Sequence, residues 1–130
     1  MSQENVEIVR RVYEAAASRD SAAVFALYDP EVELDCSRLG LGVYRGHEGL
    51  RSLFRDWHEA WESIEYSYEE LIDAGETVIA VVTRHARGRA SGVEVKQPFV
   101  LVWTLRGSKV VRVVWFLTRA EALEAAGLGE

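Results

Sequence analysis

The 130-residue sequence is poor in cysteine, proline and long hydrophobic runs. Its single cysteine, Cys36, cannot form an internal disulfide, and no Cys/His spacing resembles a zinc site, so we expect a reduced protein without a bound metal. No apolar run reaches the ~18 residues of a transmembrane helix. The polar, acidic N-terminus lacks the basic start and apolar core of a signal peptide, so we expect a cytoplasmic protein that does not enter a membrane.

Basic residues are also scarce relative to acidic ones. Fifteen Lys and Arg stand against twenty-one Asp and Glu, which gives a formal net charge of −6. Nonspecific nucleic-acid binding needs a cationic surface, so we expect no nucleic-acid partner. The remaining composition, 48% hydrophobic and 28% charged, is typical of a globular protein, and the length predicts one domain over residues 1–130.

The N-terminal half of the sequence predicts three helices. Apolar residues recur at helical spacing over residues 3–18, and Asp20 is placed to cap a short second helix. The third helix is marked by the apolar stripe Leu50, Leu53, Phe54, Trp57 and Trp61. Between the second and third helices we expect a short strand at residues 32–36 and a loop over residues 37–44.

The C-terminal half predicts a run of strands joined by short turns. Strands are expected over residues 65–72, 77–87, 93–105 and 110–117. Pro98 indicates an edge position or a bulge in the third of these strands. Gly107-Ser108 predicts a tight hairpin with positive φ at its first central residue. Thr118 and Glu121 form a capping box for a terminal helix. Helices followed by antiparallel strands indicate an α+β fold with helices on one face of a sheet.

Several segments together resemble a known superfamily. They are Arg11-Val-Tyr-Glu-Ala15, Tyr28-Asp-Pro-Glu-Val32, Tyr44-Arg-Gly-His-Glu-Gly49, Trp103-Thr-Leu105 with the following hairpin and Val110-Val-Arg112, and the terminal segment 120–128. Over essentially its whole length the sequence resembles the nuclear transport factor 2-like superfamily, in particular the polyketide-cyclase-like (SnoaL-like) branch that includes ketosteroid isomerases. The resemblance implies a strongly curved antiparallel sheet forming a cone, three N-terminal-half helices packed on it, a short C-terminal helix and a pocket inside. It also implies a homodimer, commonly through the outer face of the sheet.

Asp35, at the end of the alternation that begins at Val32, matches the general base of the ketosteroid isomerases in this resemblance. A base must reach its proton at hydrogen-bond distance, and an apolar wall can raise the pKa of a carboxylate toward neutrality. Alternatively, Asp35 is an exposed strand-end residue that favours the following loop. The rest of the isomerase machinery is absent: the matching aspartate is Leu101, and the matching tyrosine lies near Val12. Tyr13 is one residue from there, about 100° around the helix.

Alternation with period two assigns the strand residues to two faces. The resemblance places one set inside the cavity: Val82, Arg84 and Ala86; Gln97, Phe99, Leu101 and Trp103; Val110, Arg112, Val114 and Phe116. The other face of the last strand, with Val111, Val113 and Trp115, is too apolar to leave in water. It therefore supports a homodimer independently of the resemblance.

Three charged or titratable residues are candidates beside Asp35. A buried arginine is rare unless paired, so Arg84 and Arg112 are interpreted either as anchors for a ligand carboxylate, phosphate or enolate, or as structural or exposed residues. For Arg112, the structural alternative is a pair with Asp35 or Glu62. His58 lies beside the stripe of the third helix, where it is either an acid or base in the cavity or half solvated at its edge.

The predicted ligand pocket is mainly aromatic and apolar. It comprises Tyr13, Phe54, Trp57, Arg84, Gln97, Phe99, Leu101, Trp103, Val114 and Phe116. One hypothesis is a cofactor-free isomerase, cyclase, dehydratase or epoxide hydrolase for a small hydrophobic metabolite, with Asp35 as base, Arg112 as electrophilic stabiliser and His58 as a further candidate. The alternatives are a non-catalytic protein that binds a small hydrophobic ligand, and an interaction module whose cone is filled by its own side chains.

Overall fold

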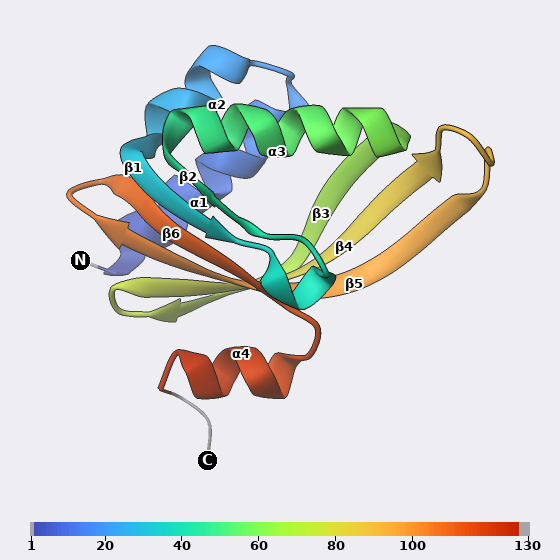
Figure 1. Cartoon of the computed structure of the whole chain (residues 1–130). Helices are drawn as coiled ribbons and strands as arrows, with labels where there is room; N and C mark the ends of the chain where they lie inside the picture. The colour runs from blue at the N-terminus through green and yellow to red at the C-terminus, as the bar shows by residue number, and fades with distance from the viewer. Residues whose placement is uncertain (1, 128–130) are drawn as a thin grey trace.

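The structure is a computed structural model that describes residues 2–127, apart from the side chain of Ser2. Three helices cover one face of a strongly bent sheet, and a fourth helix packs on the opposite face (Figure 1). This arrangement confirms the predicted α+β fold. Within residues 2–127 no helix is both long enough and apolar enough to cross a membrane.

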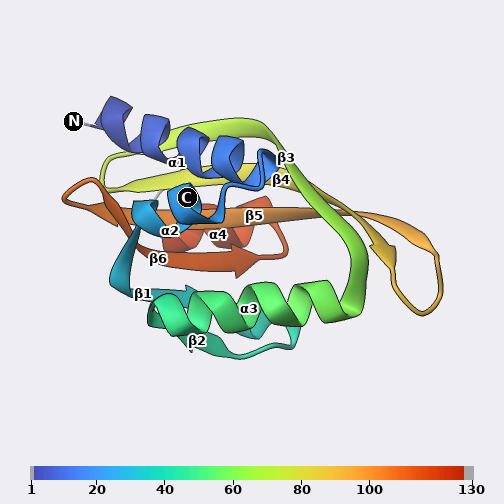
Figure 2. The same ribbon diagram turned by 90° about the horizontal axis from the view of Figure 1, so that it is seen from above.

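The three covering helices form where the apolar periodicity predicted them. They are α1 (Ser2–Ala17), α2 (Ser21–Leu27) and α3 (Gly46–Ala60). Asp20 caps α2, because its Oδ1 accepts a hydrogen bond from the amide of Ala23 at 3.1 Å. On α3 the first four residues of the predicted stripe face the sheet, and Leu50 and Leu53 are fully buried. The prediction is wrong for its last member, Trp61, which is the first residue of β3 because the chain leaves the helix after Ala60. Figure 2 shows α1 over the β3–β4 side of the sheet and α3 over the β1–β2 side.

Six strands form one open, mixed sheet. They are β1 (Tyr28–Asp35), β2 (Val43–Arg45), β3 (Trp61–Ala74), β4 (Thr77–Gly88), β5 (Glu94–Arg106) and β6 (Lys109–Phe116). Their order is β2-β1-β6-β5-β4-β3, and all neighbours are antiparallel except β1 and β6, which are parallel. The prediction of a loop over residues 37–44 is wrong at β2. This edge strand has only three residues, too few for an alternating pattern to show in the sequence.

β4 and β5 extend beyond β6 as an arm, along which β4 remains paired with β3 (Figures 1 and 2). The pairing of β5 with β6 begins only at Val100, so Pro98 lies where β5 has a partner on one side alone. This agrees with the predicted edge position, because a proline cannot donate a backbone hydrogen bond to a second neighbour. At the tip of the arm, Arg89 donates to the backbone oxygen of His58 at 2.7 and 3.1 Å and to that of Trp61 at 3.3 Å. The arm is thereby tied to the end of α3.

The chain turns sharply at both ends of β6. In the hairpin before it, Gly107 and Ser108 have φ of 58° and 66°. The sequence predicted a positive φ only at the first central residue, Gly107. In the structure both central residues are in the left-handed region. After β6, Oγ1 of Thr118 accepts a hydrogen bond from the amide of Glu121 at 3.2 Å and begins α4 (Arg119–Ala125), as the capping box predicted.

The sheet has one hydrophobic cluster on each face. The larger cluster fills the space between the concave face and helices α1–α3, and includes the fully buried Val9, Leu34 and Leu53. The smaller cluster lies between the convex face and α4, and includes Ile79, Val100, Val102, Val114, Phe116 and Ala122. The helix α4 therefore covers apolar residues of the convex face.

The face assignment predicted for β6 is wrong beyond Val110. The register with β5 shifts between Thr104 and Leu105: Thr104 pairs with Arg112, whereas Leu105 pairs with Val110. The extra residue, Val111, forms a β-bulge, which breaks strict alternation. Val113 and Trp115 consequently join the concave cluster, while Val114 and Phe116 join the convex one. Because Val113 and Trp115 do not lie on the convex face, the surface argument for a homodimer loses two of its three residues.

Candidate functional site

A row of polar side chains crosses the concave face. Tyr66 on β3, Arg84 on β4 and Gln97 on β5 are paired in register, so their side chains emerge side by side on the same face of the sheet. The next inward-facing row contains Tyr68, Val82 and Phe99. Alternation in β3, β4 and β5 thus directs one polar row and several aromatic rings toward the helices.

Arg84 is the buried charge of this row, with only 8% of its surface exposed. Its Nε donates to Oε1 of Gln97 at 3.0 Å, and its Nη2 donates to the same oxygen. The guanidinium carbon lies 5.2 Å from the ring centroid of Trp61 and 4.9 Å from that of Phe99, which are cation–π distances. Across residues 2–127 no carboxylate forms an ion pair with Arg84. A neutral amide and two aromatic rings therefore hold this cation.

An aromatic group next to this row lies under α3. The ring of Trp57 is centred 5.7 Å from that of Tyr66 and 6.1 Å from that of Trp115. Phe54, one turn earlier on α3, is 5.8 Å from Trp57. The rings of α3, β3 and β6 thus meet over the centre of the concave face.

A second aromatic group lies under α1. The ring of Tyr13 is 5.3 Å from that of Tyr68 and meets Trp103 edge to face at 5.6 Å. Tyr28 lies 6.2 Å from the same tryptophan. Tyr13 therefore points into the interior from α1, although it is one residue from the position that the family resemblance assigns to the isomerase tyrosine.

Five buried polar atoms of these two groups lack a well-formed hydrogen bond. They are Oη of Tyr13 and Tyr66 and Nε1 of Trp57, Trp103 and Trp115. Every one can donate a hydrogen bond, and an indole N–H can only donate. Trp103 nevertheless acts as a donor toward Tyr13, and Arg84 and Trp115 act as donors toward Tyr66, each lowering the pKa of the phenol. Buried polar atoms normally have a partner, because leaving one unpaired costs about 1–3 kcal/mol. The interior is therefore rich in donors without a well-formed hydrogen bond.

The other titratable groups of the interior are held neutral by burial. Burial raises the pKa of Tyr13 and Tyr28, and the nearby phenols raise both values further. Burial also raises the pKa of Tyr66, although the nearby Arg84 and Trp115 act in the opposite direction. The pKa of Cys36 is raised to about 12, by burial first and then by the neighbouring charge of Asp35. Cys36 is therefore an uncharged thiol, in line with its interpretation as a small buried residue.

Asp35 does not face this interior. It is paired in register with Val114, which belongs to the convex cluster, whereas its neighbours Leu34 and Cys36 belong to the concave one. One carboxylate oxygen accepts hydrogen bonds from the amide and hydroxyl of Ser37 at 3.0 and 2.6 Å, and the other lies 3.6 Å from Arg38. Asp35 therefore stabilises the following turn, which was the alternative interpretation.

The pKa of Asp35 is shifted in the direction opposite to that expected of a base in an apolar pocket. Burial acts to raise it, but the two hydrogen bonds from Ser37, with the charges of Arg38 and Arg112, outweigh burial and lower the pKa. The carboxylate is thus held as an anion that is already hydrogen-bonded. This lowered pKa does not support activation of Asp35 by an apolar wall, and its role as a base stays a prediction.

Arg112 and His58 also lie outside the concave interior. Because of the bulge at Val111, Arg112 points to the convex side, where its side chain is 51% exposed and its Nε lies 3.4 Å from Oε2 of Glu33. His58 is exposed near the end of α3, one residue and about 100° from the inward-facing Trp57. The prediction that Arg112 shares a cavity with Asp35 is wrong, and its exposed alternative is closer to the structure.

Eight of the ten predicted pocket residues lie in or against the concave interior. They are Tyr13, Phe54, Trp57, Arg84, Gln97, Phe99, Leu101 and Trp103. Val114 and Phe116 do not, because the bulge at Val111 turns them to the convex cluster. For the eight residues that lie in or against the concave interior, the role of ligand contact stays a prediction.

Four aromatic residues of the two groups were missed: Tyr28, Tyr66, Tyr68 and Trp115. The alternation of Ile64, Tyr66 and Tyr68 with polar neighbours was a usable signal for Tyr66. Trp115 carried no such signal, because its strand is apolar on both faces.

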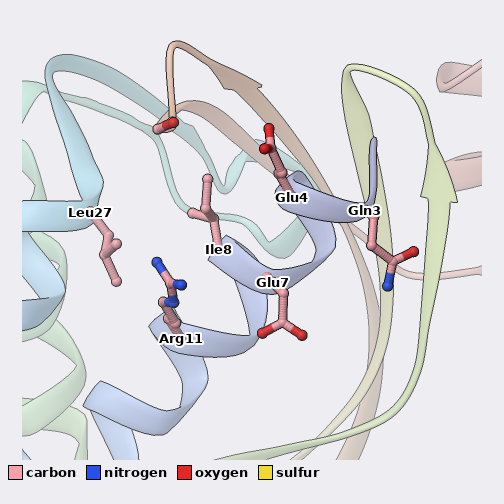
Figure 3. A pocket seen from close by; sticks show the side chains of 7 residues that line it. Gln3, Glu4, Glu7, Ile8, Arg11 and Leu27 are labelled. Atoms are coloured by element: carbon pink, nitrogen blue, oxygen red, sulfur yellow. The ribbon is translucent and has the colours of Figure 1, made fainter. Parts of the chain in front are cut away.

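Two open grooves mark the outer side of α1. One, of about 340 Å³, lies between α1, the end of α2 and the β5–β6 hairpin, with Arg11 and Leu27 in its lining (Figure 3). The other, of about 470 Å³, runs between α1 and α2 and shares these two residues. Neither lining includes the interior aromatic residues. Among the described residues, no group of three or more His, Cys, Asp and Glu side chains could hold a metal ion.

Comparisons with known proteins agree with this architecture. An NTF2-like protein of unknown function from Burkholderia pseudomallei is 26% identical, with a TM-score of 0.79 over 93% of this chain and 95% of that chain. An NTF2-like protein from Burkholderia thailandensis is 28% identical, with a TM-score of 0.76 over 95% of each chain. TerC, solved after co-crystallisation with polyporic acid, is 22% identical, with a TM-score of 0.78 over 95% of this chain and 98% of that chain.

Among curated proteins, no sequence matches this chain. The family model of the SnoaL-like domain matches residues 9–113, which include both aromatic groups except Trp115. This match covers most of the chain and agrees with the resemblance drawn from the sequence motifs. The protein is therefore a member of the SnoaL-like domain family within the NTF2-like superfamily.

Proposed function

We propose that this protein binds a small, largely apolar molecule between helices α1 and α3 and the concave face of the sheet. The observation that carries the proposal is the set of five buried donors without well-formed hydrogen bonds on Tyr13, Trp57, Tyr66, Trp103 and Trp115. A ligand with acceptor oxygens would supply the missing hydrogen bonds, while its carbon skeleton would pack against the surrounding rings.

A module filled only by its own side chains accounts less well for these atoms. Five unpaired donors, at about 1–3 kcal/mol each, are a large cost beside the 5–15 kcal/mol that stabilises a typical domain. A purely structural core would gain stability from Phe at the positions of Tyr13 and Tyr66. The retention of polar aromatic residues thus favours a site that is completed by a ligand.

Binding, and not proton abstraction, is the activity that the interior supports. Among the described residues no Asp, Glu or His is buried, and Arg84 is the one buried ionisable side chain that carries charge. Asp35 is occupied on the convex side by Ser37 and Arg38. We therefore take the non-catalytic alternative over the hypothesis of an isomerase or cyclase with Asp35 as its base.

The neighbours place this proposal in context without identifying the ligand. TerC was co-crystallised with polyporic acid, but at 22% identity that likeness shows the fold alone. We keep the homodimer as part of the proposal on the family resemblance, and the molar mass in solution by light scattering tests it.

A ligand screen tests the proposal. Aromatic and alicyclic compounds that carry carbonyl or carboxyl oxygens are added to the protein, and thermal unfolding and tryptophan fluorescence are followed. Binding raises the unfolding temperature with concentration and changes the fluorescence, because three tryptophans belong to the site. For a compound that binds, Tyr66→Phe should weaken affinity roughly 5- to 30-fold, since one hydrogen bond to a buried donor is lost.

The matched control is Asp35→Asn, which alters the convex face. It should leave the affinity for such a compound unchanged. Conversion of the compound to a product by the wild type but not by Asp35→Asn would reverse the choice between binder and enzyme. Equal affinity of the wild type, Tyr13→Phe and Tyr66→Phe would show that the compound binds elsewhere, for example in the grooves beside α1.

A further inference from the structure

We infer that the molecule bound in the interior is an organic anion whose negatively charged oxygens dock on Arg84, with a carboxylate as the simplest such group. This inference rests on the proposed function and specifies the chemical class of the ligand. It concerns the end of the interior where Tyr66, Arg84 and Gln97 stand in one row across the sheet.

Arg84 lacks a counter-charge. Arg84 is almost fully buried, and in the described part of the chain it has no carboxylate partner. A buried, unpaired cation is costly, because the protein interior solvates charge poorly. The other arginine considered from the sequence, Arg112, is exposed and nevertheless has an acidic partner in Glu33. The buried arginine thus lacks the partner that the exposed one possesses.

The guanidinium of Arg84 is held in place by a neutral amide and two aromatic rings. Gln97 accepts from Nε and Nη2 with a single oxygen, while the rings of Trp61 and Phe99 lie against the group. A guanidinium has five N–H donors, so most of its donor capacity remains after Gln97 is satisfied. Arginine binds carboxylates in a two-pronged manner, and a guanidinium already fixed by its neighbours loses little further freedom in doing so.

The surroundings of Arg84 are neutral and rich in hydrogen-bond donors. The phenol of Tyr66 stands next to Arg84 without a well-formed hydrogen bond, and it is kept protonated because burial raises its pKa more than Arg84 and Trp115 lower it. Nε1 of Trp57 and Trp115 are further donors without well-formed hydrogen bonds around the ring of Tyr66. An anionic oxygen only accepts hydrogen bonds, so it matches both the charge of Arg84 and the polarity of these donors. A cationic ligand would meet donors with donors and would be repelled by Arg84, whereas a neutral hydroxyl could accept hydrogen bonds but would leave the charge of Arg84 uncompensated.

The experiment compares matched acids and amides. The probes are benzoate and 2-naphthoate, each paired with its carboxamide, which has nearly the same shape but no charge. Affinities are measured by isothermal titration calorimetry. For the wild type we expect at least one acid to bind about 10- to 100-fold more tightly than its amide, the range that a charge-assisted hydrogen bond provides.

Two variants locate the effect. Arg84→Met keeps the length of the side chain without the charge and should abolish the preference for the acid. Arg87→Met removes an arginine of the same strand that pairs with Glu94 on the exposed arm, and should preserve the preference. If Arg84→Met does not fold, Arg84→Lys replaces it. Lysine keeps the charge without the planar fork, so part of the preference should remain.

The outcomes separate the inference from the proposed function. If an acid and its amide bind the wild type equally and Tyr66→Phe weakens both, the interior binds ligands but the anion inference is wrong. If the preference survives Arg84→Met and disappears in Arg87→Met, the anion binds outside the interior and the inference is also wrong. If none of the four probes binds and the ligand screen finds nothing, the proposed function fails as well.

Discussion

The two faces of the same sheet treat their polar side chains in opposite ways. On the convex face, Glu33 pairs with Arg45 and Arg112, and Asp35 is bonded to Ser37 and Arg38. On the concave face, Arg84 has a neutral partner in Gln97 but no acidic one, and five donors of aromatic side chains lack a well-formed hydrogen bond. The exposed charges thus have partners of opposite charge, whereas the buried cation does not. The difference indicates that the concave side is incomplete in the protein alone.

The comparison also separates two kinds of stabilisation. The convex side gains from a short helix over a small apolar cluster and from exposed ion pairs, which contribute little individually. The concave side gains from burying large apolar surfaces, which outweigh the unpaired donors within them. Three changes would break or sharpen this contrast.

The largest effect is expected from the apolar part of the concave side. Leu34→Ala removes a fully buried side chain of β1 and should lower the free energy of unfolding by about 2–5 kcal/mol, because it loses apolar burial and leaves a cavity. Leu117→Ala, at a side chain that is 54% exposed, is the control and should change it by less than about 0.5 kcal/mol. Urea denaturation measures both. Similar losses in the two variants would contradict the concave cluster as the main source of stability.

A smaller effect of opposite sign is expected from the unpaired phenols. Tyr13→Phe and Tyr66→Phe each remove a buried hydroxyl without a well-formed hydrogen bond, so unfolding of the ligand-free protein should become harder by about 1 kcal/mol. Tyr44→Phe is the control, because its hydroxyl donates to Asp56 at 3.0 Å and its loss should destabilise or change nothing. Thermal and urea unfolding give the comparison. Destabilisation by both interior substitutions would show that these hydroxyls have partners, and the basis of the proposed function would be lost.

The smallest effect concerns acid on the convex side. The pKa of Asp35 is lowered in the folded protein, so the unfolded chain takes up the proton first as the pH falls. Its contribution is therefore complete above the unfolded value of about 4 and is lost as the pH falls through the lower, folded value. Asp35→Asn should lower stability slightly at pH 7 and reduce the acid dependence below about pH 5. Acid unfolding is followed by circular dichroism as the pH is lowered. If the wild type and Asp35→Asn lose stability identically below about pH 5, this role of Asp35 is contradicted.

The helices and most strands were predictable because their signals are local. Asp20 and Thr118 each cap a helix through the residue three positions away, and the stripe of α3 repeats along the helix up to Trp57. In β4 and β5, period-two alternation correctly directed Arg84, Gln97 and Trp103 to one face. Each of these predictions depends on neighbours in the sequence.

The errors arose where local pattern and long-range packing diverge. β6 is apolar on both faces, so alternation showed two sets without showing which set meets the helices. A single bulged residue, Val111, then reversed the set that contains Arg112. Asp35 followed the same logic: its neighbours Leu34 and Cys36 face the concave cluster, so the aspartate faces away.

By itself, the sequence determined the α+β architecture, the family, the caps and the aromatic character of the interior, because helix and strand periodicity are set by residues close along the chain. Only the tertiary structure decided that Asp35 and Arg112 lie outside and that Arg84 lies inside without an acidic partner. It also decided that the indole and phenol donors around Arg84 lack well-formed hydrogen bonds. The physical reason is that pairing, burial and the phase of a bulged strand depend on residues brought together from distant segments, and no local pattern records that encounter.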